Sequence, residues 1–308
     1  MPISKITPSK VLVPADVPAK MKAQYIKNFL TATCETGNLM LFAGDQKVEH
    51  LNRDFFGDDI HPNDNDPEHL FKVASLSKIG AFAGQFGLIA RYGNDYKNIP
   101  YIIKLNSKTD LISTKQTEPF SQQWLSAYNV ETFRTDSGLN IVGVGYTIYL
   151  GSEFESDMLR EAAQIAYDAH RFGMLAIFWI YPRGKAITNE KDPDLIAGAT
   201  GTAVCLGADF VKVNYPQLQG KKSKDLFKQA ILSAGRTGVI CSGGSATDPK
   251  VFLQQLADQI EVGARGNATG RNIHQKSLNE AIRMANAIYA ITIEGKTADE
   301  AYKIYLGK

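Results

Sequence analysis

The sequence predicts a single-domain (β/α)8 barrel, an α/β fold in which parallel strands alternate with helices. Short apolar runs flanked by glycine alternate with helical patterns along the chain. About eight such pairs fill roughly 250 residues, which is the usual size of this barrel. No low-complexity or linker-like stretch divides the 308 residues. A doubly wound open sheet uses the same alternation and is the main alternative fold.

The strand candidates are short runs rich in β-branched and aromatic residues. They are residues 40–45, 79–85, 101–106, 145–150, 175–181, 209–214, 238–242 and 261–268. The run at 79–85 is rich in glycine and has the weakest strand pattern.

The helix candidates lie between these runs. In residues 153–172 the apolar positions recur three and four residues apart, which is the spacing of one helix face. The segments 193–206, 222–234, 249–258 and 276–293 show the same spacing.

Three segments stand outside the alternation. Residues 1–36 precede the first strand and predict an N-terminal extension. Residues 52–68 and 107–122 are polar and follow the first and third strands. In a barrel they would be long loops on the catalytic face and could act as lids. They could equally be solvated insertions without a role.

The composition is that of an ordinary soluble protein. There are 34 basic and 32 acidic residues, interspersed, with a net charge of +2, so nucleic acid and membrane surfaces are poor candidates for the main partner. The cysteines Cys34, Cys205 and Cys241 show no CxxC spacing, which favours a reducing compartment. The N-terminus lacks an apolar signal segment, and no run is long enough to span a membrane. We therefore expect a cytoplasmic protein.

Polar residues at the carboxyl ends of the predicted strands define a candidate site, because barrel enzymes place their catalytic groups there. Their joint placement is stronger evidence than any one of them. They are Asp45, Lys104, Tyr181, Lys212, Ser242, Gly243, Gly244, Gly270 and Arg271.

Lys212 is the most unusual of these residues, because it lies within an apolar strand pattern. If Val211 and Val213 face the surrounding helices, strand periodicity points Lys212 into the barrel. Burial there would favour a neutral amine that can attack a carbonyl and form a Schiff base. Lys212 could instead be an interior ion-pair partner. Lys104 has the same pattern, and the residues alone do not rank the two lysines.

Asp45 and Tyr181 are candidate acid–base groups for such chemistry, since both end strands that open toward the same cavity. A positive charge nearby would lower the pKa of Tyr181 and suit it to proton transfer. Asp45 could otherwise cap a helix or pair with a lysine, and Tyr181 could be a core aromatic residue.

The loops after the last two strands predict a phosphate site. Ser242-Gly243-Gly244 and Gly270-Arg271 each precede a helix pattern. Glycine allows close approach of the backbone to an anion, and helix N-termini direct N–H groups toward it. These two loops are the usual phosphate site of barrel enzymes, and Arg271 adds a guanidinium group. The alternative is that both are simply tight turns.

Five motifs together resemble the archaeal-type class I fructose-1,6-bisphosphate aldolases, including their bacterial branch. The similarity runs from about Leu39 to Gln275. It implies a cofactor-free and metal-free cleavage of fructose 1,6-bisphosphate to dihydroxyacetone phosphate and glyceraldehyde 3-phosphate, and the reverse condensation. The motifs, in order, are GDQKVEH, FWIYPRG, GADFVKVNYP, SGGS and GNATGRNIHQ.

The resemblance also implies roles for single residues. It selects Lys212 over Lys104 as the imine-forming amine, Tyr181 for proton transfer at the breaking carbon–carbon bond, and Asp45 for carbinolamine dehydration. Trp179 would lie beside the bound phosphosugar. The phosphate and substrate contacts would come from Ser242, Gly243, Gly244, Gly270, Arg271, His50 and Lys104.

One departure from the family pattern bears on specificity. Gln46-Lys47 follows Asp45 where the family commonly has His-Gly, which removes an imidazole and adds a charge. The acidic segment 52–68 is also unusual beside an anionic substrate. Because of these two features, the motifs do not fix the identity of the second phosphate or sugar end of the substrate.

Other functions remain open at this stage. They are a related Schiff-base or transaldolase-like enzyme acting on another phosphosugar, and a non-catalytic phosphosugar-binding barrel. A metal-dependent aldolase is disfavoured, because the five histidines show no HxH spacing. A calcium loop at 64–68 is disfavoured because its ligand pattern is absent. By resemblance we expect a homo-oligomer, which could be ring-shaped. Its subunit contacts would be made through residues 1–36 or through the C-terminal residues.

Overall fold

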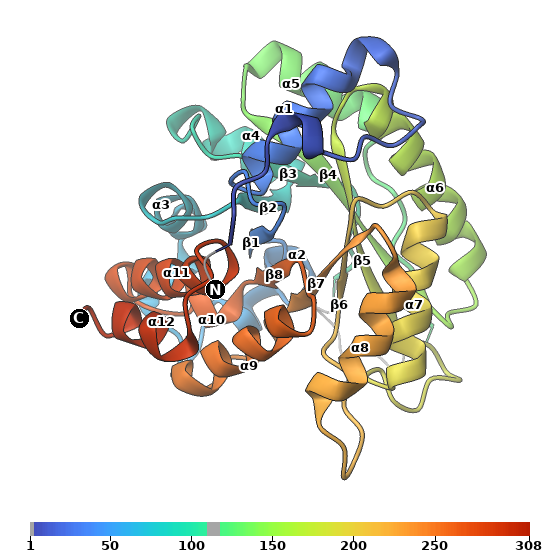
Figure 1. Cartoon of the computed structure of the whole chain (residues 1–308). Helices are drawn as coiled ribbons and strands as arrows, with labels where there is room; N and C mark the ends of the chain where they lie inside the picture. Colours follow the sequence, from blue (N-terminus) through green and yellow to red (C-terminus); the bar gives the residue numbers. More distant parts are fainter. Residues whose placement is uncertain (1–2, 110–117) are drawn as a thin grey trace.

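Eight parallel strands form a closed barrel in the computed structural model, which describes residues 3–109 and 118–308 (Figure 1). Each strand pairs with the next along the chain, and the last pairs with the first. The (β/α)8 prediction is therefore confirmed, and the open-sheet alternative is wrong. The strands are β1 Leu39–Ala43, β2 Ala81–Gln85, β3 Tyr101–Lys104, β4 Ile141–Leu150, β5 Leu175–Pro182, β6 Phe210–Val213, β7 Gly238–Ser242 and β8 Gly266–Thr269.

Helices surround the barrel, and each of the five predicted helix segments overlaps one, although the helix predicted at 249–258 continues to Glu261 (Figure 1). None of the helices formed by the described residues is long and apolar enough to cross a membrane. The helices are α1 Lys22–Ala32, α2 Gln46–Glu49, α3 Glu68–Leu76, α4 Phe86–Tyr92, α5 Ala127–Ser137, α6 Glu155–Arg171, α7 Pro193–Cys205, α8 Ser223–Ala234, α9 Pro249–Glu261, α10 Arg271–His274, α11 Leu278–Thr292 and α12 Ala298–Tyr305.

The largest boundary error concerns the last strand, predicted at 261–268. Helix α9 continues through Glu261, and Gly263 follows it with a φ of +108°, a conformation that ends a helix readily only at glycine. The strand itself begins at Gly266, where a Cβ would lie 1.9 Å from the Leu39 carbonyl oxygen. The apolar residues at 261–265 therefore belong to a helix end and a turn.

The barrel separates two apolar clusters. The outer cluster packs the strands against the helices and includes Val211 and Val213. The inner cluster fills the barrel and includes Phe210 and Trp179. Because side chains alternate along a strand, Lys212 shares the inward face with Phe210, as its periodicity predicts.

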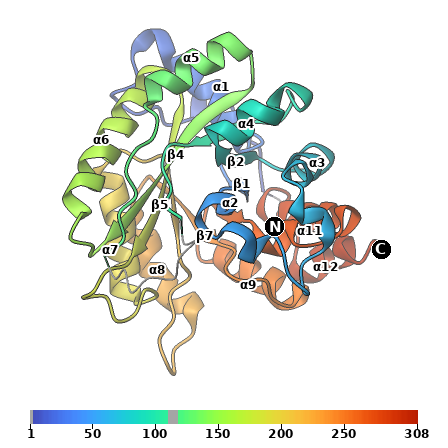
Figure 2. The same cartoon turned by 180° about the vertical axis from the view of Figure 1, so that it is seen from behind.

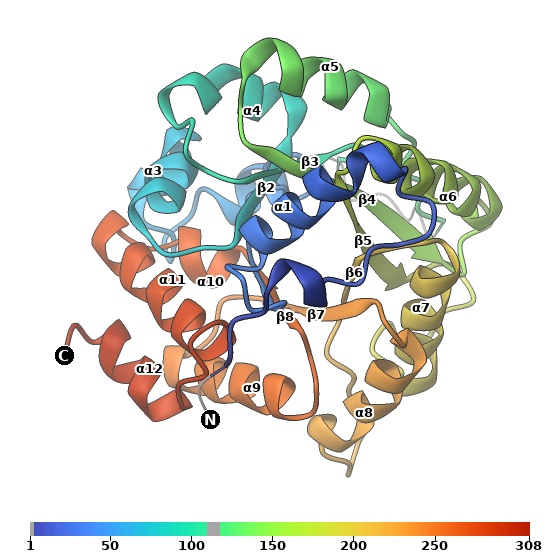
Figure 3. The same cartoon turned by 45° about the horizontal axis from the view of Figure 1, so that its top comes forward.

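The N-terminal extension closes one end of the barrel, where α1 lies across it (Figure 3). Tyr25 of α1 belongs to the inner cluster and donates a hydrogen bond to Asp209, which directly precedes β6. Asn28 donates to the carbonyl of Gly173, just before β5, at 2.7 Å. These contacts place α1 at the amino ends of the strands, opposite the predicted site.

The acidic segment after β1 is folded onto the protein. It contains two short 3-10 helices, Leu51–Asp54 and Pro62–Asn65, and it buries Asp54, Phe55 and Asp64. These three side chains anchor the segment, although most of its other described residues are exposed, so whether the insertion has a role stays a prediction. Of the segment 107–122, residues 110–117 lie outside the described residues, whereas Ser107 and Ser121 are buried.

Candidate active site

Two lysines lie inside the barrel near the carboxyl ends of their strands. Lys212 of β6 and Lys104 of β3 have exposed fractions of 4% and 2%. Both amines face the ring of Trp179 on β5, with Nζ 5.4 Å and 4.4 Å from the ring centroid. Gly145 leaves room for this arrangement, because a Cβ there would lie 2.6 Å from the Trp179 ring and 3.0 Å from Lys104 Cδ.

Burial changes the acidity of both amines. It lowers the pKa of Lys104 to about 8, against the raising influence of Asp45 and Glu49, and the charge of Lys212 lowers it further. Burial also lowers the pKa of Lys212, with Asp45 and Glu49 again opposing and Arg271 adding to the effect. Each lysine is therefore closer to the neutral, nucleophilic form than a lysine in water.

The amines of the two lysines differ in their hydrogen-bond partners. Lys104 donates to Thr147 Oγ1 at 2.5 Å and lies 3.5 Å from Asn106 Oδ1. Among the described residues, the Lys212 amine forms no hydrogen bond or ion pair and contacts the Trp179 ring instead. An amine held by two acceptors is less available to attack a carbonyl than one that has none. The geometry therefore favours Lys212 as the nucleophile.

Two carboxylates face the lysines from the end of β1. Asp45 precedes α2, but its side chain makes no capping hydrogen bond, and its Oδ1 is buried without a partner. The backbone carbonyl of Asp45 accepts a hydrogen bond from Gln85 Nε2 at 2.9 Å. Glu49 follows one helical turn later and accepts a hydrogen bond from Tyr149 at 2.8 Å. Figure 2 shows α2 next to β1, on the side of the barrel away from α1.

Tyr181 lies at the end of β5 in register with Tyr149 of β4. Burial raises the pKa of Tyr181, and the charges of Asp45 and Glu49 raise it further, whereas Arg183 opposes them. The expectation that positive charge lowers this pKa is wrong, because two carboxylates outweigh one guanidinium. The Tyr181 hydroxyl is therefore protonated at neutral pH and suited to donate a proton.

The two predicted phosphate loops lie side by side, because β7 and β8 are neighbours. Gly243 N donates to Ala268 O at 3.1 Å, and Asn272 of α10 donates to the carbonyl of Gly243 at 2.9 Å. Ser242 contacts Asn214 at 3.0 Å between their side-chain oxygens. Gly244 has a φ of +66°. The first loop is thus tied to the strand and helix that carry the second.

Gly270 is a close-approach position in the second loop. A Cβ there would lie 2.5 Å from Gln46 Nε2 and 2.7 Å from the Ala43 carbonyl. The Gln46 side chain therefore lies against the phosphate loop, and its Oε1 is buried without a partner. The neighbouring Lys47 turns toward the acidic segment, where its Nζ lies 4.1 Å from the Phe55 ring centroid.

Arg271, the first residue of α10, contacts the acidic segment. Its Nη1 lies 3.5 Å from Asp54 Oδ1, and Asp54 Oδ2 lies 2.7 Å from His50 Nδ1. Arg271 and His50, predicted separately as substrate contacts, are therefore joined through one carboxylate.

Several residues of this site were missed from the sequence. Thr147 pairs in register with Trp179, and Tyr149 with Tyr181. Strand register would have revealed both, given the inward positions on β5. No local signal identifies the contact of Asp54 with Arg271, because Arg271 belongs to α10 at the other end of the chain.

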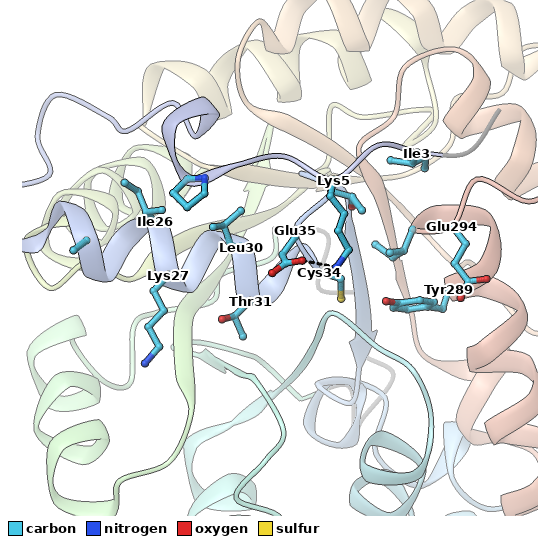
Figure 4. A pocket seen from close by; sticks show the side chains of 14 residues that line it. Ile3, Lys5, Ile26, Lys27, Leu30, Thr31, Cys34, Glu35, Tyr289 and Glu294 are labelled. Atoms are coloured by element: carbon cyan, nitrogen blue, oxygen red, sulfur yellow. Dashed lines mark hydrogen bonds and ion pairs between the residues drawn. The ribbon is translucent and has the colours of Figure 1, made fainter.

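The protein has one cavity that borders this site and a larger groove that lies away from it. A cavity of about 320 Å³ borders Lys104 and is lined by Lys47, Val48, Gln85, Phe86, Leu88, Trp124 and Leu125. A groove of about 950 Å³ lies beside α1 and α11, lined by residues such as Leu30, Cys34 and Tyr289 (Figure 4). None of the site residues lines the larger groove, so its size does not mark the chemistry. Among the described residues, no three His, Cys, Asp or Glu side chains are grouped to hold a metal ion.

Comparison with known proteins gives one consistent family. The family model described as "DeoC/LacD family aldolase" matches residues 39–276. The chain is 58% identical to the fructose-bisphosphate aldolase/6-deoxy-5-ketofructose 1-phosphate synthase of Methanocaldococcus jannaschii, over 99% of this chain and 97% of that protein. It is 32% identical to the class 1 fructose-bisphosphate aldolase of Thermoproteus tenax, over 92% of this chain and 100% of that protein.

Solved structures agree. A fructose-bisphosphate aldolase from Slackia heliotrinireducens is 54% identical with a TM-score of 0.96, covering 99% of this chain and 96% of that one. An archaeal fructose-1,6-bisphosphate aldolase whose catalytic lysine is bound to the carbinolamine intermediate is 33% identical with a TM-score of 0.74, covering 87% and 98%. The chain therefore belongs to the DeoC/LacD aldolases, within the Schiff-base class I fructose-bisphosphate aldolase family.

Proposed function

We propose that the protein joins dihydroxyacetone phosphate to an aldehyde through an imine on Lys212, and that fructose 1,6-bisphosphate is the product and, in reverse, the substrate. The observation that carries this proposal is the buried Lys212 amine, which has a lowered pKa and forms no hydrogen bond among the described residues. An acid, a protonated tyrosine and two phosphate-type loops accompany it at the same barrel end.

In the cleavage direction the neutral Lys212 amine attacks C2 of the ketose and forms a carbinolamine. Asp45, whose Oδ1 has no partner in the protein, is placed to pass a proton to the departing hydroxyl, which leaves as water. The resulting iminium draws the electrons of the C3–C4 bond toward C2 as the C4 hydroxyl gives its proton to the Tyr181 oxygen, while Tyr181 passes its own proton to the Asp45 carboxylate that the dehydration left ionised. Glyceraldehyde 3-phosphate leaves, and an enamine remains.

Protonation of the enamine at C3 and addition of water to the imine then release dihydroxyacetone phosphate and restore the amine. In the condensation direction, Tyr181 donates its proton to the aldehyde oxygen as the new bond forms. Its raised pKa suits this donor role. Trp179 Nε1 is buried without a partner and is available to a substrate oxygen.

A second product is compatible with the same site. The name of the Methanocaldococcus relative includes 6-deoxy-5-ketofructose 1-phosphate synthase. That sugar keeps the donor half of fructose bisphosphate but has a methyl group in place of the phosphate-bearing end. The cavity beside Lys104 is lined by Lys47 and Lys104 as well as by Phe86, Leu88 and Trp124, and the apolar part of this lining suits a methyl end.

Borohydride trapping with dihydroxyacetone phosphate, with and without EDTA, tests the chemistry. We expect a reduced adduct on Lys212 that forms despite chelation, located by peptide mass spectrometry. An adduct on Lys104 would contradict the residue assignment, and no adduct despite phosphosugar binding would favour a non-catalytic barrel. Comparing kcat/KM for fructose 1,6-bisphosphate and 6-deoxy-5-ketofructose 1-phosphate then distinguishes the two products.

A further inference from the structure

One carboxylate of the acidic segment lies between two of the proposed substrate-binding residues. Asp54 Oδ1 is 3.5 Å from Arg271 Nη1, and Asp54 Oδ2 is 2.7 Å from His50 Nδ1. The Asp54 side chain has an exposed fraction of 11%, and that of Arg271 is 24%. A phosphate group that approaches Arg271 therefore meets a negative charge already in place.

The segment that carries Asp54 is fixed to α10. Gln275 Nε2 donates to the Asp54 carbonyl at 2.8 Å, and the Phe55 ring stacks on His274 with 4.7 Å between centroids. His274 and Asp64 form a fully buried pair at 2.7 Å. These contacts hold Asp54 beside Arg271, so the carboxylate cannot leave without unpacking the segment.

Asp54 is ionised in this setting. Burial works to raise the pKa of its carboxyl group, but the close His50 imidazole and the charges of Arg271 and His274 together hold the pKa below its ordinary value. The charge of Arg271 is thereby offset by a neighbour that remains negative at neutral pH.

We propose that Asp54 is a built-in counter-anion of the phosphate site, which weakens the hold of Arg271 on a phosphate group. This inference rests on the phosphate site proposed above. The charges of Arg271 and Asp54 offset each other, so an incoming dianion meets less positive charge than the guanidinium alone would offer.

Sulfate is a suitable probe, because it stays a dianion between about pH 6 and about pH 8.5, so any pH dependence belongs to the protein. Calorimetric titration of the whole protein, with chloride exchanged for sulfate at constant ionic strength, gives its Kd. We expect Asp54→Asn to tighten sulfate binding roughly three- to tenfold at about pH 8.5. Asp58→Asn, an exposed change of the same charge in the same segment, should have no effect.

Weaker or unchanged sulfate binding in Asp54→Asn would overturn the counter-anion.

Failure of the phosphate site itself would look different. If the wild type binds no sulfate, the counter-anion inference and the phosphate-site assignment both fall. Borohydride trapping on Lys212 would then show independently whether the imine chemistry survives.

Discussion

Lys104 and Lys212 occupy equivalent sequence patterns, yet their surroundings differ. Thr147 and Asn106 bind the Lys104 amine, whereas the Lys212 amine faces Trp179. The sequence could place both lysines at strand ends, because strand periodicity is local. It could not rank them, because the groups that bind Lys104 come from β4 and from the loop after β3.

The two lysines should respond differently to methionine substitution. Lys212→Met removes the amine that forms the imine, so we expect loss of borohydride trapping and at least a thousandfold loss of kcat. Lys104→Met should keep trapping on Lys212. Trapping lost in Lys104→Met and retained in Lys212→Met would reverse the assignment.

The lowered pKa of Lys104 also predicts how the stability of the protein changes with pH. Its pKa is lowered to about 8 in the folded protein, against an ordinary value of 10.5. Between these two values the unfolded chain binds more protons than the folded one, so stability rises with pH. The wild type should gain up to roughly 3 kcal/mol over this window relative to Lys104→Met. Urea unfolding of both proteins between about pH 7.5 and about pH 10.5 measures the difference; parallel curves would contradict it.

Tyr181→Phe should separate the two halves of the reaction. The variant keeps Lys212 and Asp45, so imine trapping with dihydroxyacetone phosphate should persist. Cleavage of the ketose should slow by roughly 10²- to 10⁴-fold, because the hydroxyl that carries the C4 proton away in the carbon–carbon step is lost. Tyr149→Phe, which removes a hydroxyl bound to Glu49, is the matched control and should slow cleavage less. Equal loss in both variants would argue against a specific role of Tyr181.

At the scale of elements, the predicted phosphate loop after β8 packs closely against α2, and we expect its shape to depend on this contact. Gly270→Ala would place a Cβ 2.5 Å from Gln46 Nε2 and 2.7 Å from a backbone carbonyl. We expect a loss of roughly 1–3 kcal/mol of stability and a raised KM for phosphorylated substrates. Gly198→Ala in α7, where a Cβ meets nothing within 4 Å, should instead be neutral or stabilising. Urea unfolding and kinetics of both variants test the contrast.

The elements also show where sequence patterns stop being informative. Segments with clear helical spacing, such as 153–172, fall within about two residues of their helices. The strand at 261–268 was misplaced because short apolar runs fit a helix end as well as a strand. The acidic segment looked like solvated loop, since its burial depends on contacts with α10 more than 200 residues away.

At the scale of the whole molecule, the end of the barrel opposite the site contains its own buried charges. His170 Nδ1 lies 2.8 Å from Asp16, and its Nε2 lies 3.2 Å from Asp209. Burial opposes the charge, but Asp209 and Asp16 raise the pKa of His170 to about 9. The cluster ties the N-terminal extension to α6 and β6.

This cluster predicts a pH dependence of the opposite sign to that of Lys104. A raised folded-state pKa gives stability that is fully present below about pH 6.5 and is lost as pH rises through about 9. His170→Gln should therefore lose stability relative to the wild type at about pH 6 and less at about pH 9. Thermal unfolding across this range measures the difference, and a pH-independent gap would contradict it.

The closure of one barrel end by α1 affects the order in which the two products leave. Among the described residues, the inner apolar cluster and α1 fill the barrel below Lys212, so the site opens at the carboxyl ends of the strands. Under the proposed reaction, the aldehyde product occupies the passage that the hydrolytic water must take to reach the imine. The aldehyde therefore departs first and water follows it inward. Dihydroxyacetone phosphate, the half of the sugar that is bound covalently to Lys212, leaves last.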